Sequence, residues 1–117
     1  MTNTQLGQKG EKVASQYLEK MGYTIVSRNY KSSYGEIDII AKDKNELVFV
    51  EVKTRCSKKY GEAREAVNEP KKKHIKKAAT YYIYKHRLEN ELIRFDVMEV
   101  YAKENEFQIK QIKNTLW

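Results

Sequence analysis

The stretch Gly35-Glu36-Ile37-Asp38-Ile39-Ile40 decides the fold of this chain together with Glu51-Val52-Lys53, which starts thirteen residues after Asp38. Both stretches predict β-strands, because Ile and Val are enriched in strands and the preceding residues 47–50 are apolar. Each stretch nevertheless carries charged residues, and a charge is rarely buried without a partner because its desolvation costs several kcal/mol. The two stretches therefore indicate neighbouring strands that hold a site between them.

The rest of the sequence predicts a single α/β domain over residues 1–117, a length that allows one compact core. Residues 5–21 have apolar side chains at three- and four-residue spacings, so we expect a helix with Thr4 as its N-cap and Gly22 at its C-terminal end. A second helix is expected from Asn68 or Glu69 to about residue 86, after a long polar connection. Strands are expected at residues 23–30, 36–41, 46–54, 92–102 and 107–112. The predicted order is α-β-β-β-α-β-β.

Strand alternation predicts how the charged residues lie relative to one another. Glu51 and Lys53 are two residues apart and therefore share a face of their strand. Residues 42–45 are polar and predict a tight antiparallel hairpin with the preceding strand. A turn centred on residues 43–44 would place Asp38 opposite Phe49 and diagonal to Glu51, within reach of it.

Two carboxylates and one ammonium group are the minimal set for metal-assisted hydrolysis of a phosphodiester. Mg²⁺ prefers oxygen ligands and is usually held by one or two carboxylates with water and substrate phosphate. We expect Asp38 and Glu51 to bind Mg²⁺ or Mn²⁺, with the Val52 carbonyl as a third ligand. Such a metal stabilises charge on the phosphate and lowers the pKa of a bound water, which Lys53 would orient or deprotonate. Lys53 can instead hold the phosphate as a point charge.

Two plainer interpretations stand beside this one. Glu51 and Lys53 can form a solvent-exposed pair, which contributes about 0–1 kcal/mol and has no function. Glu11 lies at the margin of the apolar stripe of the first helix. It is either an additional acidic residue of the site or a solvated helical glutamate.

The net charge of +7 is concentrated in one third of the chain. Residues 52–88 hold twelve Lys or Arg and three Glu, whereas the remaining residues hold eleven basic and thirteen acidic groups. A concentrated basic surface is typical of a protein that binds a polyanion, although a lysine-rich helix face can also be merely solvated. The residues that we expect to contact nucleic acid are Arg55, Lys58, Lys59, Lys71, Lys72, Lys73, Lys76 and Lys77.

Other features of the sequence exclude several classes of protein. Cys56 is the single cysteine, so the chain has neither an internal disulfide nor a cysteine metal site. No apolar run approaches the roughly 20 residues of a membrane span. The first residues lack the pattern of a secretory signal. We therefore expect a soluble cytoplasmic protein that has no membrane partner.

The motifs resemble the PD-(D/E)xK nuclease superfamily, and within it the YraN-like proteins, which are similar to archaeal Holliday junction resolvases. The resemblance covers nearly the whole chain and rests on these stretches: Gly10-Glu11-xx-Ala14 with Tyr17-Leu18, Arg28-Asn29-Tyr30, Gly35 to Ile40, Val50 to Arg55, Ala66-Val67 and Pro70-Lys71. It implies a nuclease-like domain with a restriction-endonuclease-like αβββαβ core, a mixed central sheet flanked by helices and an extra C-terminal strand. It further implies that Asp38, Glu51 and Lys53 are catalytic and that Glu11 is an added acidic residue. Ile37 stands where the superfamily name has proline.

These observations lead to two hypotheses on function. The first is a Mg²⁺- or Mn²⁺-dependent endonuclease that acts on DNA, with branched or otherwise structured DNA as candidate substrates. The second is a catalytically inactive nucleic-acid-binding protein that retains the nuclease fold. A third, weaker interpretation is a protein-interaction domain whose lysines are only solvated.

Several tyrosines are candidates for contacts outside the catalytic set. Tyr34 and Tyr60 fall in predicted loops near the site, where they can stack on bases. Resolvase-like folds often act as dimers, so a homodimer is also a candidate assembly. Tyr81 and Tyr84 of the second helix, or the last two strands, would then supply the interface.

Overall fold

The computed structural model describes residues 2–56, 69–104 and 106–115, and the predicted order α-β-β-β-α-β-β is confirmed. Neither of the two helices in this part of the chain is long and apolar enough to cross a membrane. The elements are α1 (Asn3–Lys20), β1 (Thr24–Ser32), β2 (Gly35–Asp43), β3 (Glu46–Arg55), α2 (Glu69–Lys85), β4 (Leu92–Lys103) and β5 (Glu106–Ile112).

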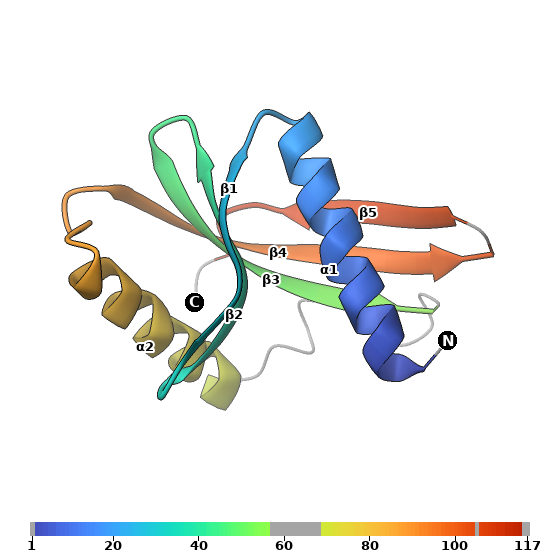
Figure 1. The fold of residues 1–117 in the computed structure, drawn as a ribbon, viewed down its shortest axis with the longest axis horizontal. Helices are drawn as coiled ribbons and strands as arrows, with labels where there is room; N and C mark the ends of the chain where they lie inside the picture. The colour runs from blue at the N-terminus through green and yellow to red at the C-terminus, as the bar shows by residue number, and fades with distance from the viewer. Residues whose placement is uncertain (1, 57–68, 105, 116–117) are drawn as a thin grey trace.

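The five strands form a mixed sheet in the order β1-β2-β3-β4-β5 (Figure 1). Neighbouring strands are antiparallel except for β3 and β4, which are parallel over residues 46–55 and 92–101. Parallel neighbours need a long crossover connection, and the segment that contains α2 supplies it. The described residues therefore form a mixed α/β domain with two helices and a five-stranded sheet.

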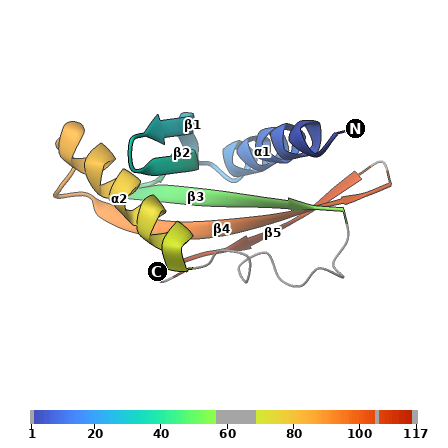
Figure 2. The ribbon, with the colours of Figure 1, turned by 90° about the horizontal axis from the view of Figure 1, so that it is seen from below.

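Side chains alternate along β3 between two hydrophobic clusters, one on each face of the sheet. Val48 and Val50 pack with Leu18 and other residues of α1. Phe49 packs on the opposite face with Tyr82 of α2. Figure 2 shows α1 lying over the sheet, with α2 crossing the molecule near β2 and β3. Both faces of β3 are therefore covered, and residues 47–52, which include Glu51, are buried.

The first helix begins two residues earlier than predicted, because Thr2 and not Thr4 is its N-cap. The Thr2 hydroxyl accepts a hydrogen bond of 3.1 Å from the Gln5 backbone, and the Gln5 side chain accepts one of 2.8 Å from the Thr2 backbone. This reciprocal pair is a capping box, which satisfies two amides that the helix leaves open. At the other end, Gly22 has a φ of +96° and ends the helix as predicted.

The turn of the β2–β3 hairpin lies one residue later than predicted, which shifts the pairing of the two strands by two residues. The turn lies at residues 44–45, where Lys44 has the positive φ of +56° that two-residue hairpins commonly use. Phe49 therefore pairs with Ile40, and Asp38 does not lie opposite Phe49. The β2–β3 pairs end at Ile39 and Val50, so Asp38 and Glu51 are the residues next to the last pair on each strand.

Candidate active site

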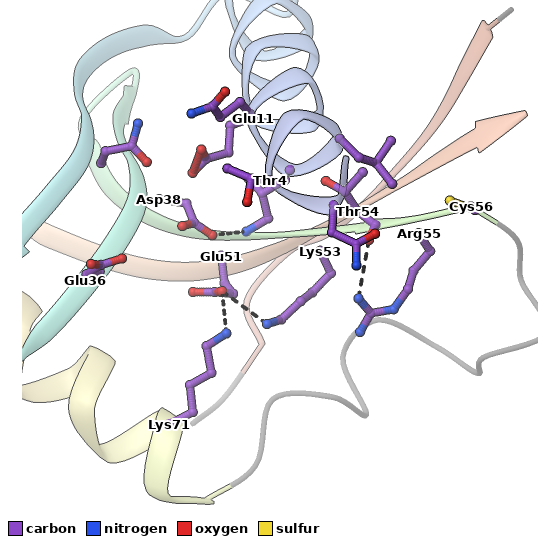
Figure 3. Close-up of a pocket in the computed structure, with 16 residues that line it drawn as sticks. Thr4, Glu11, Glu36, Asp38, Glu51, Lys53, Thr54, Arg55, Cys56 and Lys71 are labelled. Carbon is purple, nitrogen blue, oxygen red and sulfur yellow. Dashed lines mark hydrogen bonds and ion pairs between the residues drawn. The ribbon is translucent and has the colours of Figure 1, made fainter. Parts of the chain in front are cut away.

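A cleft of about 710 Å³ lies where α1, β2, β3 and the start of α2 meet (Figure 3). This volume is in the range of small-molecule and cofactor sites. The cleft contains both signs of charge in close proximity. Its charged lining residues are Glu11, Glu36, Asp38, Glu51, Lys53, Arg55 and Lys71.

Asp38 is held by the backbone of the neighbouring strand. Its Oδ2 accepts a hydrogen bond of 2.8 Å from the Val52 N–H. The β2–β3 ladder ends at Ile39 and Val50, so the Asp38 side chain takes the place of the next backbone partner. In an extended strand the N–H and C=O of one residue point toward the same neighbour. The Val52 carbonyl, the predicted third metal ligand, therefore lies on the same edge as Asp38.

Glu51 is buried, with 6% of its side chain exposed, and it is flanked by two ammonium groups. Its Oε1 lies 2.9 Å from Lys71 Nζ and 3.4 Å from Lys53 Nζ. Figure 3 shows the two lysines approaching Glu51 from α2 and β3. A buried carboxylate needs such partners because the charge is otherwise too costly to desolvate. Glu51 and Lys53 are therefore not a solvent-exposed surface pair.

The contact between Lys71 and Glu51 differs from the prediction for Lys71. We expected Lys71 to contact nucleic acid with the other lysines of α2, but the structure directs it to Glu51. Sequence spacing could not show this contact, because it depends on how the first turn of α2 packs against the end of β3.

The pKa of Asp38 is raised to about 8. Burial is the largest cause, and the negative charge of Glu51 adds to it, while the hydrogen bond from Val52 opposes both. Asp38 therefore holds a proton at neutral pH unless a cation replaces it. A pair of carboxylates in this state is well suited to a divalent cation, whose charge favours the ionised form of both.

Glu11 of α1 reaches the same acidic group. Burial raises the pKa of Glu11, against the opposing effects of its hydrogen bond with Asp38 and the charge of Arg28. The structure thus brings Glu11 into the cleft beside Asp38, and Figure 3 shows it pointing from α1 toward β2. Glu11 is not an isolated solvated glutamate of a helix surface.

Gly10 explains how α1 comes close enough to deliver Glu11. A Cβ placed at Gly10 would lie 2.9 Å from Thr54 Cβ and closer still to the Thr54 hydroxyl. Real Cβ atoms do not make contacts this short, so the absence of a side chain allows the helix to rest on β3. Gly10 therefore sets the distance between α1 and the strand that carries Glu51.

Asn29 is a residue of the cleft that the sequence did not single out as functional. It has a φ of +54° and lies between the ladder pairs on either side of it, Arg28–Ile39 and Tyr30–Ile37. With its amide nitrogen toward Glu11, it donates hydrogen bonds of 2.8 and 3.1 Å to the two carboxylate oxygens. A signal was present, because Asn is among the few residues that tolerate positive φ.

The pKa values of the two lysines beside Glu51 are shifted in opposite directions. Burial lowers the pKa of Lys53, and its contact with Lys71 lowers it further, against the opposing charge of Glu51. Burial acts in the same direction on Lys71, but its hydrogen bond with Lys53 and the charge of Glu51 outweigh burial and raise its pKa. Lys53 is therefore the lysine that more readily gives up a proton.

The donor atoms of the cleft suit Mg²⁺ or Mn²⁺ better than a transition metal bound by nitrogen or sulfur. Asp38 and Glu51 offer carboxylate oxygens, and Val52 offers a carbonyl oxygen. Within residues 2–56, 69–104 and 106–115, no three His, Cys, Asp or Glu side chains form a ready-made metal cage. A magnesium site does not require one, because Mg²⁺ keeps several waters and takes substrate phosphate as a ligand.

The remaining residues that we expect to contact nucleic acid lie at the cleft, on α2, or outside the part of the chain that the structure describes. Arg55 lines the cleft and donates a hydrogen bond of 3.3 Å to the Thr54 carbonyl. Lys72 is half-buried and pairs with Glu69 at 3.4 Å. Residues 73, 76 and 77 are exposed lysines of α2. Lys58, Lys59 and Tyr60 lie outside the residues that the structure describes.

Comparison with known proteins shows the family of this chain. Residues 10–100 match the uncharacterised protein family UPF0102. A UPF0102 protein of Caldicellulosiruptor saccharolyticus is 46% identical over 116 residues, which cover 97% of this chain and 98% of the relative. A UPF0102 protein of Clostridioides difficile is 48% identical over 114 residues, again covering 97% and 98%. The chain belongs to the UPF0102 family, which confirms the expected YraN-like relationship.

Proposed function

We propose that this UPF0102 protein is a metal-dependent endonuclease that hydrolyses phosphodiester bonds in DNA. The proposal assigns its mixed α/β fold to the restriction-endonuclease-like architecture of the PD-(D/E)xK superfamily. The observation that carries it is the state of Glu51, which is buried between Lys53 and Lys71 with Asp38 on the adjacent strand. A purely structural ion pair would not need a second carboxylate with a raised pKa facing the same cleft.

The acidic residues would hold the metal. Asp38, Glu51 and the Val52 carbonyl are the proposed ligands, and Glu11 adds negative charge beside them. A bound Mg²⁺ or Mn²⁺ supplies charge stabilisation at the phosphate that is attacked. With its amide nitrogen toward Glu11, Asn29 would hold the Glu11 carboxylate in the cleft through two hydrogen bonds.

The two lysines would handle the proton and the phosphate charge. Because burial lowers the pKa of Lys53, its amine can accept the proton of the attacking water, whose oxygen forms the new bond to phosphorus. The bond from phosphorus to the leaving deoxyribose oxygen breaks, and that oxygen takes up a proton from solvent. Lys71 remains charged, because its pKa is raised, and stabilises the negative charge that develops on the phosphate.

The basic residues of α2 are the reason for proposing a polyanionic substrate. The helix that delivers Lys71 has no Asp or Glu between Pro70 and Leu88, and it carries further lysines on its exposed face. Positive charge near a helix N-terminus opposes the macrodipole, which argues for a role beyond helix stability. DNA binding by such a surface weakens steeply with salt because each phosphate contact releases counterions.

The test is a cleavage assay on purified protein. Linear, nicked and four-way DNA are incubated with Mn²⁺, with Mg²⁺ and with EDTA, using wild-type protein, Glu51→Gln and Lys53→Ala. Lys44→Ala is the matched control, because Lys44 is an exposed lysine of the β2–β3 turn, outside the residues that line the cleft. We expect metal-dependent cleavage by the wild type and by Lys44→Ala and a loss of at least about 100-fold in both site variants.

The other outcomes separate the competing hypotheses. Cleavage that survives in both site variants comes from a contaminating nuclease and overturns the proposal. Salt-sensitive DNA binding without cleavage in either metal identifies a catalytically inactive nucleic-acid-binding protein. An absence of nucleic-acid binding at low salt leaves the interpretation of a protein-interaction domain.

A further inference from the structure

A second groove lies on the outer face of α2, away from the acidic cleft. It has a volume of about 510 Å³ and is formed by aromatic and basic side chains. None of its lining residues belongs to the acidic cleft described above. The residues that line it are Tyr34, Lys76, Lys77, Thr80, Tyr81 and Tyr84.

The tyrosines of this groove are unusually accessible for large side chains. Tyr84 is 74% exposed and Tyr34 is 47% exposed. The rings of Tyr34 and Tyr81 contact each other with centroids 5.7 Å apart. An exposed cluster of aromatic rings on a small protein indicates a binding surface, because such rings are otherwise buried in the core.

The β1–β2 turn that carries Tyr34 is fixed against α2. The Ser32 hydroxyl donates a hydrogen bond of 3.1 Å to the Gly35 carbonyl and accepts one of 3.1 Å from the Tyr34 N–H. Gly35 lies so close to His74 that an added Cβ would be 3.1 Å from the His74 Cβ. The ring of Tyr34 is therefore presented by a braced turn, which lowers the entropy cost of ordering it on binding.

The charge around the groove indicates which class of ligand it would bind. Lys76 and Lys77 line it, and Lys85 Nζ lies 5.8 Å from the centroid of the Tyr81 ring. Because the sequence has no Asp or Glu between Pro70 and Leu88, the groove has positive charge without nearby acidic groups on its own helix. Aromatic rings on which bases stack, set among lysines that contact phosphates, are the chemistry of single-stranded nucleic-acid binding.

A second copy of the chain fits this face less well. A two-fold interface places the same patch of both subunits together, so the lysines of two α2 helices would face each other. Like charges placed together at an interface are unfavourable by several kcal/mol. A duplex fits less well too, because its base faces are covered by neighbouring bases and cannot stack on a tyrosine.

We infer that the groove formed by Tyr34, Tyr81 and Tyr84 binds unpaired nucleotides of a DNA strand that continues from the duplex to be cut. This inference rests on the proposed function and narrows its substrate to DNA with a single-stranded arm. At a helical rise of 1.5 Å per residue, Tyr81 and Tyr84 lie about 15 and 20 Å along α2 from Lys71. That span corresponds to about four to six base steps of 3.4 Å, so the unpaired bases lie a few nucleotides from the phosphate that is attacked.

The experiment compares binding of a forked duplex and a blunt duplex by the full chain in EDTA. The fork carries 2-aminopurine in its single-stranded arm, because stacking on a tyrosine quenches the fluorescence of this base. Tyr84→Ala and Tyr34→Ala are tested against Tyr84→Phe and Tyr34→Phe, which keep the ring and lose the hydroxyl. For each alanine variant we expect about tenfold weaker binding of the fork and less quenching, with blunt-duplex binding unchanged and near wild-type behaviour of both phenylalanine variants.

Other results overturn the inference in distinct ways. An equal loss of binding on fork and blunt duplex shows that the tyrosines act on folding or on general DNA affinity. A phenylalanine variant as weak as its alanine counterpart shows that stacking is not the interaction. A wild-type dimer that Tyr84→Ala converts to a monomer, measured by light scattering, makes this face a dimer interface.

The same experiment separates this inference from the proposed function. Duplex binding with no preference for the fork counts against the groove alone. An absence of DNA binding by the wild-type protein at low salt counts against the proposed nuclease function, on which the inference about the groove rests. If Tyr34→Ala disturbs the β1–β2 turn, Tyr84→Ala still tests the inference. Tyr84 is an exposed residue of α2, so we expect the helix to fold without its ring.

Discussion

Asp38 and Val52 are joined by a hydrogen bond of 2.8 Å that occupies the position where the β2–β3 ladder stops. A side-chain carboxylate thus replaces a backbone carbonyl as the acceptor for β3. The pairing of the two strands ends here, and the Val52 N–H still has an acceptor. The replacement also directs the carboxylate toward the edge of β3 that carries the Val52 carbonyl. The candidate site therefore lies where two neighbouring strands stop pairing, and not in a loop attached to the sheet.

The first prediction concerns the pH dependence of stability in the absence of metal. The pKa of Asp38 is raised to about 8 in the folded protein from an ordinary value of 3.8. The folded state therefore retains a proton that the unfolded state has lost, so this residue makes stability fall as pH rises from about 4 to 8. The slope for one proton is at most about 1.4 kcal/mol per pH unit.

Urea unfolding in EDTA at pH 5 and pH 8 measures this effect. We expect Asp38→Asn to gain stability relative to the wild type as pH rises, because an amide has no proton to lose. Glu19→Gln is the control, since Glu19 is an exposed residue near the other end of α1. If the wild type and Asp38→Asn change in parallel between the two pH values, Asp38 has no raised pKa.

The second prediction concerns metal binding. A ligand that binds only the folded state stabilises it, by about 2.7 kcal/mol when its free concentration is about 100 times Kd. We expect Mn²⁺ to raise the Tm of the wild type at pH 8 and to raise it less at pH 6, because the metal must displace the proton of Asp38. Asp38→Asn and Glu51→Gln should lose the increase. An equal increase in these variants would place the metal elsewhere.

The third prediction uses two glycines of the same helix. Gly10→Ala adds a Cβ that overlaps Thr54, and overpacking of this kind costs about 1–3 kcal/mol. Gly7→Ala meets no atom within 4 Å, so it should stabilise the helix by up to about 1 kcal/mol. Thermal unfolding of both variants checks the contrast. A Gly10→Ala protein as stable as Gly7→Ala would show that α1 does not rest on β3 as closely as described.

Gly10→Ala should also reduce metal-dependent cleavage. The shift of α1 away from β3 moves Glu11 relative to Asp38, and a displacement of about 1 Å can cost as much as 100-fold in rate. Cleavage is measured at a temperature where both glycine variants remain folded. Cleavage by Gly10→Ala at the wild-type rate would mean that the position of Glu11 does not matter for the reaction.

Much of the fold follows from the sequence because the hydrophobic pattern is strong. The nearly continuous apolar run of residues 47–52 specifies a strand covered on both faces, and the spacing in residues 5–21 specifies a helix with one buried side. These patterns also predicted that Glu51 and Lys53 share a face. The order of all seven elements could therefore be predicted without knowledge of their contacts.

The details that could not be predicted depend on single backbone conformations and on long-range packing. The turn at Lys44 has no Asn-Gly or Gly-Gly signal, and its position decides which residue of β2 pairs with Phe49. The contact of Lys71 with Glu51 depends on where α2 lies after the crossover connection. Sequence periodicity is local and carries no information on either.

The last prediction concerns a second buried ionic group that is structural. Asp96 is fully buried and accepts hydrogen bonds from the Arg94 guanidinium at 3.0 Å, the Gln111 side chain at 2.9 Å and the Asn114 N–H at 3.0 Å. Asp96→Ala leaves the buried Arg94 without its main partner, so we expect a loss of about 3–5 kcal/mol in the free energy of unfolding. Asp43→Asn should cost less, since Asp43 is more exposed and Arg94 keeps Asp96.

Chemical denaturation of the two variants beside the wild type measures these losses. Asp96 is not among the residues that line the acidic cleft, so the variant should cleave DNA at the wild-type rate at a temperature where it is folded. A large loss of stability with unchanged cleavage would show that Asp96 holds β4 to Gln111 and Asn114 and takes no part in the chemistry. A loss of cleavage in folded Asp96→Ala would instead connect the Arg94 network to the site, against the division of roles argued from their positions.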